Sequence, residues 1–152
     1  MSDNVYLGNP NLKKANTQVE FTQEQIIEFV KCKEDPVYFA NNYIKIVSLD
    51  EGLTQFHPYH FQEKLINNFH ENRFNICKMP RQTGKSTTVV SYLLHYAVFN
   101  DSVNIGILAN KAATARELLS RLQTAYENLP KWMQQGIISW NKGSMELENG
   151  SK

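Results

Sequence analysis

The sequence predicts an α/β fold in which helices cover both faces of a parallel central sheet. Three observations predict it. Residues 74–79 form a short apolar run typical of a buried strand, and residues 103–109 form a second, nearly continuous one. The segment between them, 87–99, is apolar almost all round, as a helix buried against a sheet should be. Strand, helix, strand is the order of a right-handed βαβ unit.

Length and composition indicate one domain's worth of chain or a piece of a larger protein. The 152 residues are 41% apolar, which is enough for a core. The net charge of +1 excludes a global basic field, so any contact with DNA must be local or lie elsewhere. Cys32 and Cys77 lack metal-ligand spacing, and the sequence shows no signal peptide or membrane-spanning apolar run. We therefore expect reduced thiols and a soluble, cytosolic protein.

The N-terminal part predicts a polar tail followed by a capped helix. Residues 1–20 lack a periodic apolar face, so we expect a flexible tail or a segment that docks late. Thr22 and Gln25 have the spacing of a capping box, which predicts a helix that ends at about Lys33. The residues expected to face inward from this helix are Ile26, Ile27, Phe29 and Val30.

Two more helices are expected before residue 73. Asp35 and Pro36 place a capping carboxylate ahead of a first-turn proline, which predicts a short helix. Pro58 then opens a helix that ends near Asn72. Residues 21–72 are therefore expected to form an N-terminal helical region.

The turn after the first apolar run, residues 80–87, has residue types suited to phosphate binding. The start of a helix offers unpaired N–H groups and the positive end of the helix dipole to an anion. Gly84 lets the backbone approach phosphates, the Lys85 ammonium suits β- and γ-phosphate oxygens, and the Ser86 hydroxyl suits Mg²⁺. The sequence therefore predicts a loop that binds ATP and Mg²⁺. Its candidate residues are Pro80, Arg81, Gln82, Thr83, Gly84, Lys85, Ser86 and Thr87.

Met79 and Arg81 distinguish this loop from the common phosphate-binding consensus. The full consensus G-x-x-x-x-G-K-[ST] begins with glycine, whereas this chain has Met79 there, so a solvated turn with a surface lysine is the alternative. The guanidinium of Arg81 could stabilise γ-phosphate charge from within the same chain, as an arginine finger does, or it could extend into solvent. Arg81 and Lys85 are the candidate catalytic residues.

Phe61 and Gln62 are candidates for an adenine site. They lie in the first turn of the helix opened by Pro58, upstream of the loop. The ring of Phe61 could stack on adenine, while the amide of Gln62 donates to N7 and accepts from the 6-amino group. A core phenylalanine beside a surface glutamine is the alternative.

Beyond the second apolar run, the sequence predicts a helix and a hairpin. The helix runs from about Ala112 to Asn128, with Arg116 and Arg121 either solvated or in contact with DNA phosphates. Residues 137–147 contain two short apolar segments around a glycine-containing turn, which is typical of a β-hairpin.

The acidic pair of a P-loop ATPase is not found where that fold needs it. The pair ends a strand that follows the loop, where it binds Mg²⁺ and orients water. Asp50 and Glu51 imitate it, but residues 46–51 precede the loop, so we expect a loop or a short edge strand there. Residues 73–152 are therefore expected to be the first, incomplete half of a P-loop NTPase domain, a truncated RecA-like (ASCE) three-layer sandwich.

Several segments resemble the large terminase subunit of T-even-type tailed phages. The loop is the most specific of them, because R-Q-x-G-K-[ST] without the leading glycine is typical of terminases and accounts for Met79. The resemblance covers about residue 21 to the end. It is carried by residues 43–46, 61–62, 78–87, 106–111, 129–130 and 140–150.

The resemblance implies an ATPase that drives viral DNA through the portal into an empty capsid, joined in the intact protein to a C-terminal nuclease. By matching position, Lys85 and Ser86 would hold the phosphates and Mg²⁺, Arg81 would sense the γ-phosphate, and residues 61–62 would hold adenine. The implied partners are double-stranded phage DNA, the portal protein and the small terminase subunit. The implied setting is an oligomeric ring on the procapsid portal in the host cytoplasm, without a membrane.

Two alternatives remain open. A helicase-like P-loop translocase also carries an upstream glutamine and a G-K-[ST] loop. A truncated, non-catalytic module could use the same residues to bind a nucleotide or a packaging partner. Our interpretation is the ATP-binding front half of the motor, which we expect to be incompetent for turnover on its own.

Overall fold

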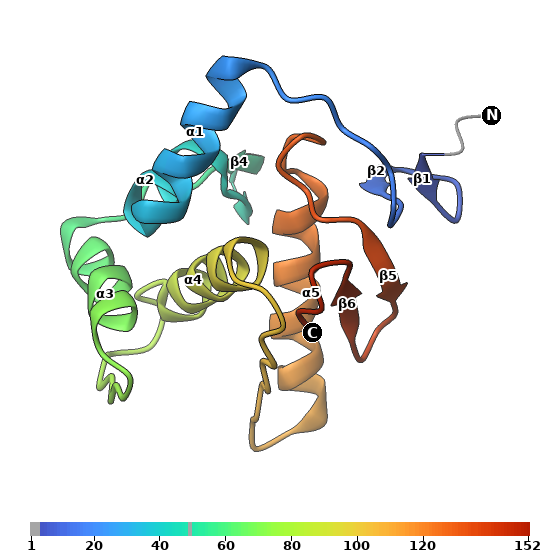
Figure 1. Cartoon of the computed structure of the whole chain (residues 1–152). Coiled ribbons are helices and arrows are strands. Elements are labelled where there is room, and N and C mark those ends of the chain that lie inside the picture. Colours follow the sequence, from blue (N-terminus) through green and yellow to red (C-terminus); the bar gives the residue numbers. More distant parts are fainter. Residues whose placement is uncertain (1–3, 49) are drawn as a thin grey trace.

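The computed structural model describes residues 4–48 and 50–152, which form five helices and six short strands (Figure 1). Helix α4 lies at the centre and packs against α2, α3 and α5. No helix in this described part is long and apolar enough to cross a membrane. The helices are α1 (Gln23–Glu34), α2 (Pro36–Tyr43), α3 (His60–Glu71), α4 (Lys85–Phe99) and α5 (Ala112–Glu127). The strands are β1 (Val5–Tyr6), β2 (Asn9–Lys13), β3 (Lys45–Ser48), β4 (Gly52–Gln55), β5 (Ile137–Trp140) and β6 (Met145–Leu147).

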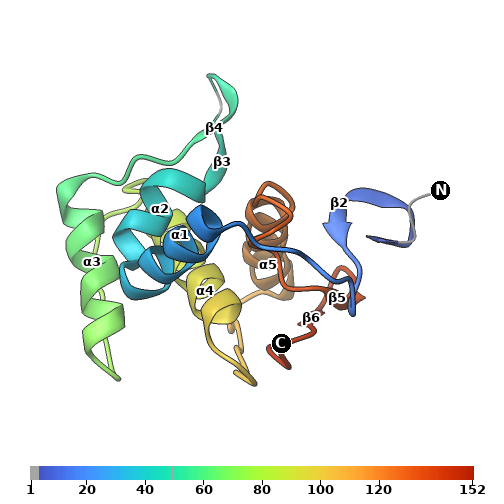
Figure 2. The ribbon, with the colours of Figure 1, turned by 45° about the horizontal axis from the view of Figure 1, so that its top comes forward.

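The predicted parallel central sheet of a P-loop sandwich is wrong for the described residues. The named strands pair as three separate two-stranded sheets, β1–β2, β3–β4 and β5–β6, and all three are antiparallel. Each sheet joins strands that are consecutive along the chain, so its pairing is local. The molecule is therefore a helical α/β assembly with small hairpins at its margins, of which β3–β4 projects at the top of Figure 2.

The two apolar runs expected to be parallel strands join the helices as extended segments. Segment 74–79 leads from α3 to α4, with the side chains of Phe74 and Ile76 83% and 101% exposed. Segment 103–109 leads from α4 to α5 (Figure 1). An apolar run favours extended backbone, but a strand also requires a partner ladder, and no named strand of the described chain pairs with either run.

Segment 103–109 nevertheless keeps some strand character. Val103, Ile105 and Ile107 are half-buried, whereas the residues between them are exposed, which is the period of two of a strand. The backbone N–H of Lys152 donates to the carbonyl of Val103 at 2.9 Å, and the N–H of Ile105 donates to the carbonyl of Lys152 at 2.7 Å. These two hydrogen bonds secure only the start of the segment.

The capping signals correctly predicted where α1 and α2 begin. The Thr22 hydroxyl accepts from the N–H of Gln25 at 3.2 Å, and the Gln25 side chain accepts from the N–H of Thr22 at 3.1 Å. The carboxylate of Asp35 accepts from the N–H of Tyr38 at 2.8 Å, directly ahead of Pro36. These hydrogen bonds satisfy N–H groups that a helix leaves unpaired at its start.

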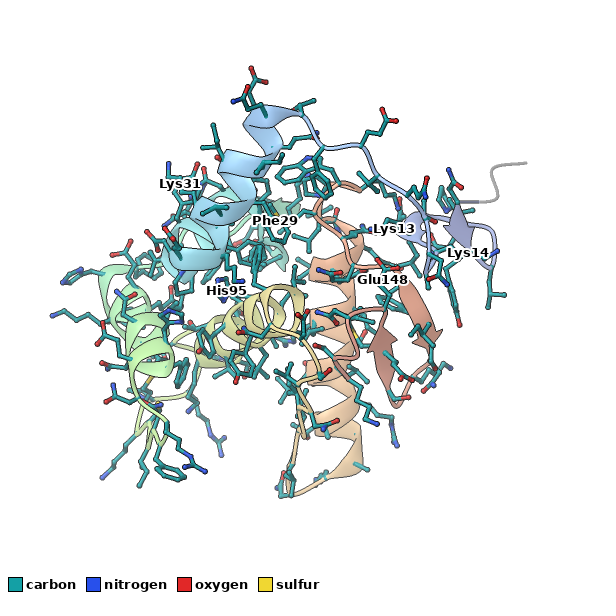
Figure 3. The ribbon with its side chains drawn as sticks, viewed as in Figure 1. Lys13, Lys14, Phe29, Lys31, His95 and Glu148 are labelled. Carbon is teal, nitrogen blue, oxygen red and sulfur yellow. The ribbon has the colours of Figure 1, made fainter. Side chains whose placement is uncertain are left out.

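The predicted inward face of α1 was largely wrong. Ile26, Ile27 and Val30 are exposed, whereas Phe29 packs toward α4, with its ring centroid 4.9 Å from that of Phe99 (Figure 3). Cys32, one turn further on, is fully buried and both cysteines are free thiols. The spacing of the apolar residues predicts the helix. It does not predict which of these residues are buried, because burial depends on which other element packs against them.

Residues 4–16 dock against the C-terminal hairpin. The Lys13 ammonium lies 3.5 Å from the Glu148 carboxylate (Figure 3), and the N–H of Ala15 donates to the carbonyl of Ile137 at 3.3 Å. Leu12 is buried in the core. Of the two alternatives for residues 1–20, docking therefore describes these positions, and residues 1–3 lie outside the described residues.

Of the loop and the short edge strand that the sequence allowed here, the structure has a strand, β3, which pairs with β4 in a hairpin over residues 45–55. Ser48 pairs with Gly52, and Asp50 and Glu51 are exposed in the turn between β3 and β4. Residue 49 lies outside the described residues. The acidic pair thus lies at a hairpin tip and does not end a central strand.

His95 is a buried titratable group at the centre of the helical core. It is 2% exposed and lies against the rings of Phe39 and Phe99 (Figure 3). Its Nε2 is 2.9 Å from the carbonyl oxygen of Cys32 and therefore carries the proton, while Nδ1 has no hydrogen-bond partner among the described residues. Burial is the main cause that lowers the pKa of His95 to about 4; the hydrogen bond to the Cys32 carbonyl opposes this shift and nearby His70 adds to it.

We expect the protein to lose stability in acid because of this histidine. The ordinary pKa of 6.5 applies to the unfolded chain, so the unfolded state binds the proton first as the pH falls. Neutral His95 contributes about 3 kcal/mol to the free energy of unfolding above about pH 6.5. This contribution is lost as the pH falls from about 6.5 toward 4. Urea unfolding at pH 7 and 4.5 measures it. The difference between the two pH values should be smaller in His95→Gln, and an equal difference would contradict the assignment.

Candidate phosphate-binding site

The loop before α4 is a tight turn built on left-handed backbone. Gly84 is the N-cap of α4 and has a φ of +72°, which glycine adopts without steric cost. Gln82 has a φ of +61°, an uncommon conformation for a residue with a side chain. The hydroxyl of Thr83 donates to the carbonyl of Pro80 at 3.1 Å and closes the turn. The loop is therefore folded back against the start of the helix.

The first turn of α4 is suited to an anion. No side chain caps this helix among the described residues, and its first turn contains no acidic residue. The first N–H groups of a helix have no partner within it, and here they belong to Lys85, Ser86 and Thr87. Together with the positive end of the helix dipole, they favour a phosphate group in front of the helix.

The Lys85 side chain lies across the loop. Its ammonium donates to the carbonyl of Met79 at 3.3 Å, so the residue at the consensus glycine position supplies a backbone contact. An ammonium has three donors, and a single carbonyl accepts one of them. Lys85 therefore retains donors and its full charge for phosphate oxygens.

The remaining loop residues differ in exposure. Arg81, Gln82 and Ser86 are exposed, whereas Thr87 is half-buried. Arg81 makes no ion pair among the described residues. The guanidinium and the Ser86 hydroxyl are thus accessible to a ligand. Ser86 is the metal-ligand candidate that the sequence predicted, and the described residues contain no group of three His, Cys, Asp or Glu side chains that could hold a metal ion.

Gln62 joins α3 to the loop. Its side chain is buried, its Oε1 accepts from the N–H of Tyr59 at 2.9 Å, and its Nε2 donates to the carbonyl of Thr83 at 3.3 Å. The sequence prediction placed Gln62 at adenine and missed the contact with Thr83. No spacing rule connects two residues so far apart, so only the folded structure reveals it.

Phe61 is exposed on the first turn of α3. Its ring stacks on that of Tyr59, with centroids 5.9 Å apart and planes inclined by 11°, and both rings are exposed. Exposed rings in this arrangement present a flat apolar surface of the kind on which a purine stacks. The sequence interpretation included Phe61 but missed Tyr59, whose place directly before the helix was the available signal.

Two cavities lie away from the loop. One of about 490 Å³ lies between residues 104–107, α5 and β6, and one of about 460 Å³ lies between α1 and residues 132–135. Neither is lined by a residue of the turn 79–87. The candidate site is the turn at the start of α4, where Arg81, Gln82 and Ser86 are exposed.

A comparison with known families connects this geometry to a class of proteins. The family model described as terminase large subunit, T4likevirus-type, N-terminal, matches residues 76–152, half of the chain. The chain belongs to this terminase family. The match includes the whole loop, α4, α5 and the C-terminal hairpin, and it confirms the predicted resemblance over these residues.

Membership of this family gives the chain a general role in the packaging of phage DNA. In general terms, its partners are the phage DNA and the other components of packaging. The match begins at residue 76, so α3 with Gln62 lies ahead of it. The contact between Gln62 and Thr83 thus connects a matched loop to a helix outside the matched range.

Proposed function

We propose that this terminase chain is the ATP-binding front portion of the motor that moves phage DNA into the procapsid, with ATP and Mg²⁺ as ligands. The observation that supports this most directly is the uncapped start of α4, with the Lys85 ammonium lying across the loop in front of it. Unpaired N–H groups, the helix dipole and the Lys85 ammonium are three features that favour the binding of a triphosphate.

Each loop residue has a defined part in the proposal. Lys85 moves from the carbonyl of Met79 to the β- and γ-phosphate oxygens, and the hydroxyl of Ser86 ligates Mg²⁺. Arg81 neutralises charge on the γ-phosphate, and the exposed ring of Phe61 stacks on adenine. In the intact motor, hydrolysis of ATP would supply the free energy for DNA movement.

The family match supports partners from DNA packaging in general. We propose that they are double-stranded phage DNA, the portal protein and the small terminase subunit, with the motor assembled as a ring on the portal in the host cytoplasm. The net charge of +1 requires that any contact of this chain with DNA be local, because basic residues outnumber acidic ones by only one.

Titration of the chain with ATP and Mg²⁺ in a calorimeter tests the proposal, alongside an assay of phosphate release. We expect saturable binding without release, because no two adjacent acidic residues follow the loop in this sequence to bind Mg²⁺ and orient water. Phosphate release by the chain alone would show that it is a complete enzyme. A lack of heat or saturation would remove ATP from the site.

A further inference from the structure

We propose that Leu7, at the tip of the β1–β2 hairpin, inserts into the apolar cavity between α1 and residues 132–135 of a second copy of this chain. The contact involves neither ATP nor the phosphate-binding loop. It rests on the proposed ring of copies, in which it would join one chain to the next.

Leu7 is an apolar side chain in an unfavourable place. It is 88% exposed and has a φ of +45°, a left-handed conformation that is uncommon for a residue with a bulky side chain. Tyr6 pairs with Asn9, so Leu7 and Gly8 form the whole turn, and both have the positive φ that a type I′ turn requires. Asparagine is preferred at the first of these two positions. A leucine there strains the turn without gaining burial, which indicates a function in another contact.

The hairpin that carries Leu7 is fixed at its base. The Asn9 side chain donates to the carboxylate of Glu127 at 3.2 Å, and the N–H of Asn16 donates to that of Glu148 at 2.8 Å. These contacts reach α5 and the C-terminal hairpin. Because the base is fixed, Leu7 is presented in one position and loses little conformational freedom on binding.

The cavity beside α1 is the complementary feature. Its volume is about 460 Å³, larger than a leucine side chain, and apolar residues form most of its lining. Phe21, Ile26 and Val30 belong to this lining and are 44%, 52% and 47% exposed, so the cavity is open to solvent at this side. The charged residues of the lining, Lys13 and Glu148, form an ion pair with each other at 3.5 Å. The cavity therefore suits an uncharged, apolar occupant.

A second copy of the chain can bring Leu7 and the cavity together. Within one chain Leu7 remains exposed, and the β1–β2 hairpin lies at the edge of the molecule, apart from α1 (Figure 1). Figure 2 shows the same separation. A projecting side chain and a cavity at different places on one surface give a head-to-tail contact, which can close into a ring. The net charge of +1 produces little repulsion between copies.

The contact is expected to be weak in isolation. A stable interface buries roughly 800 Å² on each partner, much more than one leucine side chain provides. A ring would reinforce the contact, because neighbouring copies are already held close together. The experiments therefore need to detect a transient contact between free chains.

Disulfide trapping between two different chains tests the contact. One chain carries Leu7→Cys and the other Val30→Cys, and Cys77 is changed to serine in both because its thiol is half-buried, whereas Cys32 is buried. In the control, a chain with Val47→Cys, an exposed valine on β3 outside the cavity, replaces the Val30→Cys chain. Under mild oxidation we expect the Leu7–Val30 pair to form the mixed dimer roughly tenfold faster, because docking raises the local concentration of one thiol near the other. Equal rates for the two pairs would overturn the proposal.

Leu7→Asn separates the contact from the stability of the hairpin. Asparagine before Gly8 makes the preferred type I′ turn, so the melting temperature should rise by about 2 °C. Sedimentation equilibrium of the same variant should show self-association weakened by about tenfold, the effect of losing one buried leucine. Leu53→Asn, at an exposed position on β4, is the matched control and should leave self-association unchanged. Equal self-association of Leu7→Asn and the unmodified chain would show that Leu7 is not the inserted residue.

The ATP titration distinguishes failure of this contact from failure of the proposed function. Leu7 and Val30 lie outside the phosphate-binding loop, so Leu7→Asn and Val30→Cys should bind ATP with the affinity of the unmodified chain. Faster trapping of the Leu7–Val30 pair in a chain that binds no ATP would support the contact and contradict the ATP site. ATP binding together with equal trapping rates would overturn the contact alone.

Discussion

Lys85→Ala is expected to reduce the ATP affinity of this chain by at least a hundredfold. The Lys85 ammonium is held across the loop by one hydrogen bond to the carbonyl of Met79, so its charge lies beside the uncapped N–H groups of α4. Hydrogen bonds to charged groups contribute about 1.5–3 kcal/mol each, and Lys85 is proposed to make two of them with phosphate oxygens. Their combined loss amounts to about 3 kcal/mol or more, which corresponds to the expected factor.

Calorimetric titration with ATP and Mg²⁺ measures this loss. Lys142→Ala removes the same charge from an exposed position near the tip of the β5–β6 hairpin and should leave the affinity unchanged. A thermal melt of both variants checks the fold, since Lys85 contributes only one backbone hydrogen bond to the loop. An ATP affinity equal to that of the unmodified chain would refute the assignment of Lys85 to the phosphates.

Features of the fold that depend on near neighbours were predictable from the sequence. The capping box of Thr22 and Gln25 closes over four residues, and the carboxylate of Asp35 reaches only to Tyr38. The β5–β6 hairpin likewise joins strands on either side of a short turn. In each case the residues that decide the structure are adjacent in the chain, so their spacing carries the necessary information.

Features that depend on distant partners were not predictable in the same way. Residues 74–79 and 103–109 have the composition of buried parallel strands, but a parallel ladder requires a partner that local sequence does not specify. Ile26 and Ile27 show the same limit in a helix, because an apolar side chain is buried only where another element covers it. The periodicity predicted the local backbone conformation, whereas burial and strand pairing depend on a tertiary partner.

In the candidate site, too, the local features were predictable from the sequence and the contacts with distant residues were not. The residue types from Pro80 to Thr87 predicted a turn at the start of a helix, and the structure has that turn. The structure also shows Lys85 resting on Met79 and Gln62 bonded to Thr83, and the latter contact spans 21 positions of the chain. A motif specifies which residues line a loop, whereas the residues that hold the loop in place can come from any element.

The second large effect is expected from Gln134, which joins the N-terminal hairpin to the rest of the molecule. It is 1% exposed, and its Oε1 accepts from the N–H of Lys13 at 3.0 Å. Its Nε2 has two N–H groups and lies 3.0 Å from the carbonyl oxygens of Asn11 and Leu129 and 3.3 Å from that of Tyr126, so two of these carbonyls share one N–H group. One buried amide thus satisfies backbone groups from both ends of the chain.

Gln134→Leu should lower the free energy of unfolding by about 3–5 kcal/mol, because a leucine leaves several buried backbone groups without partners at about 1–3 kcal/mol each. Urea unfolding measures the loss. Gln135→Leu is the matched control, since the neighbouring side chain is half-buried and donates one hydrogen bond, to the carbonyl of Val98 at 3.0 Å, so its loss should be about 1 kcal/mol. Hydrogen exchange should also rise in residues 5–13 of Gln134→Leu. Equal losses in the two variants would show that Gln134 does not hold the hairpin, because the buried network would then contribute no more than a single hydrogen bond.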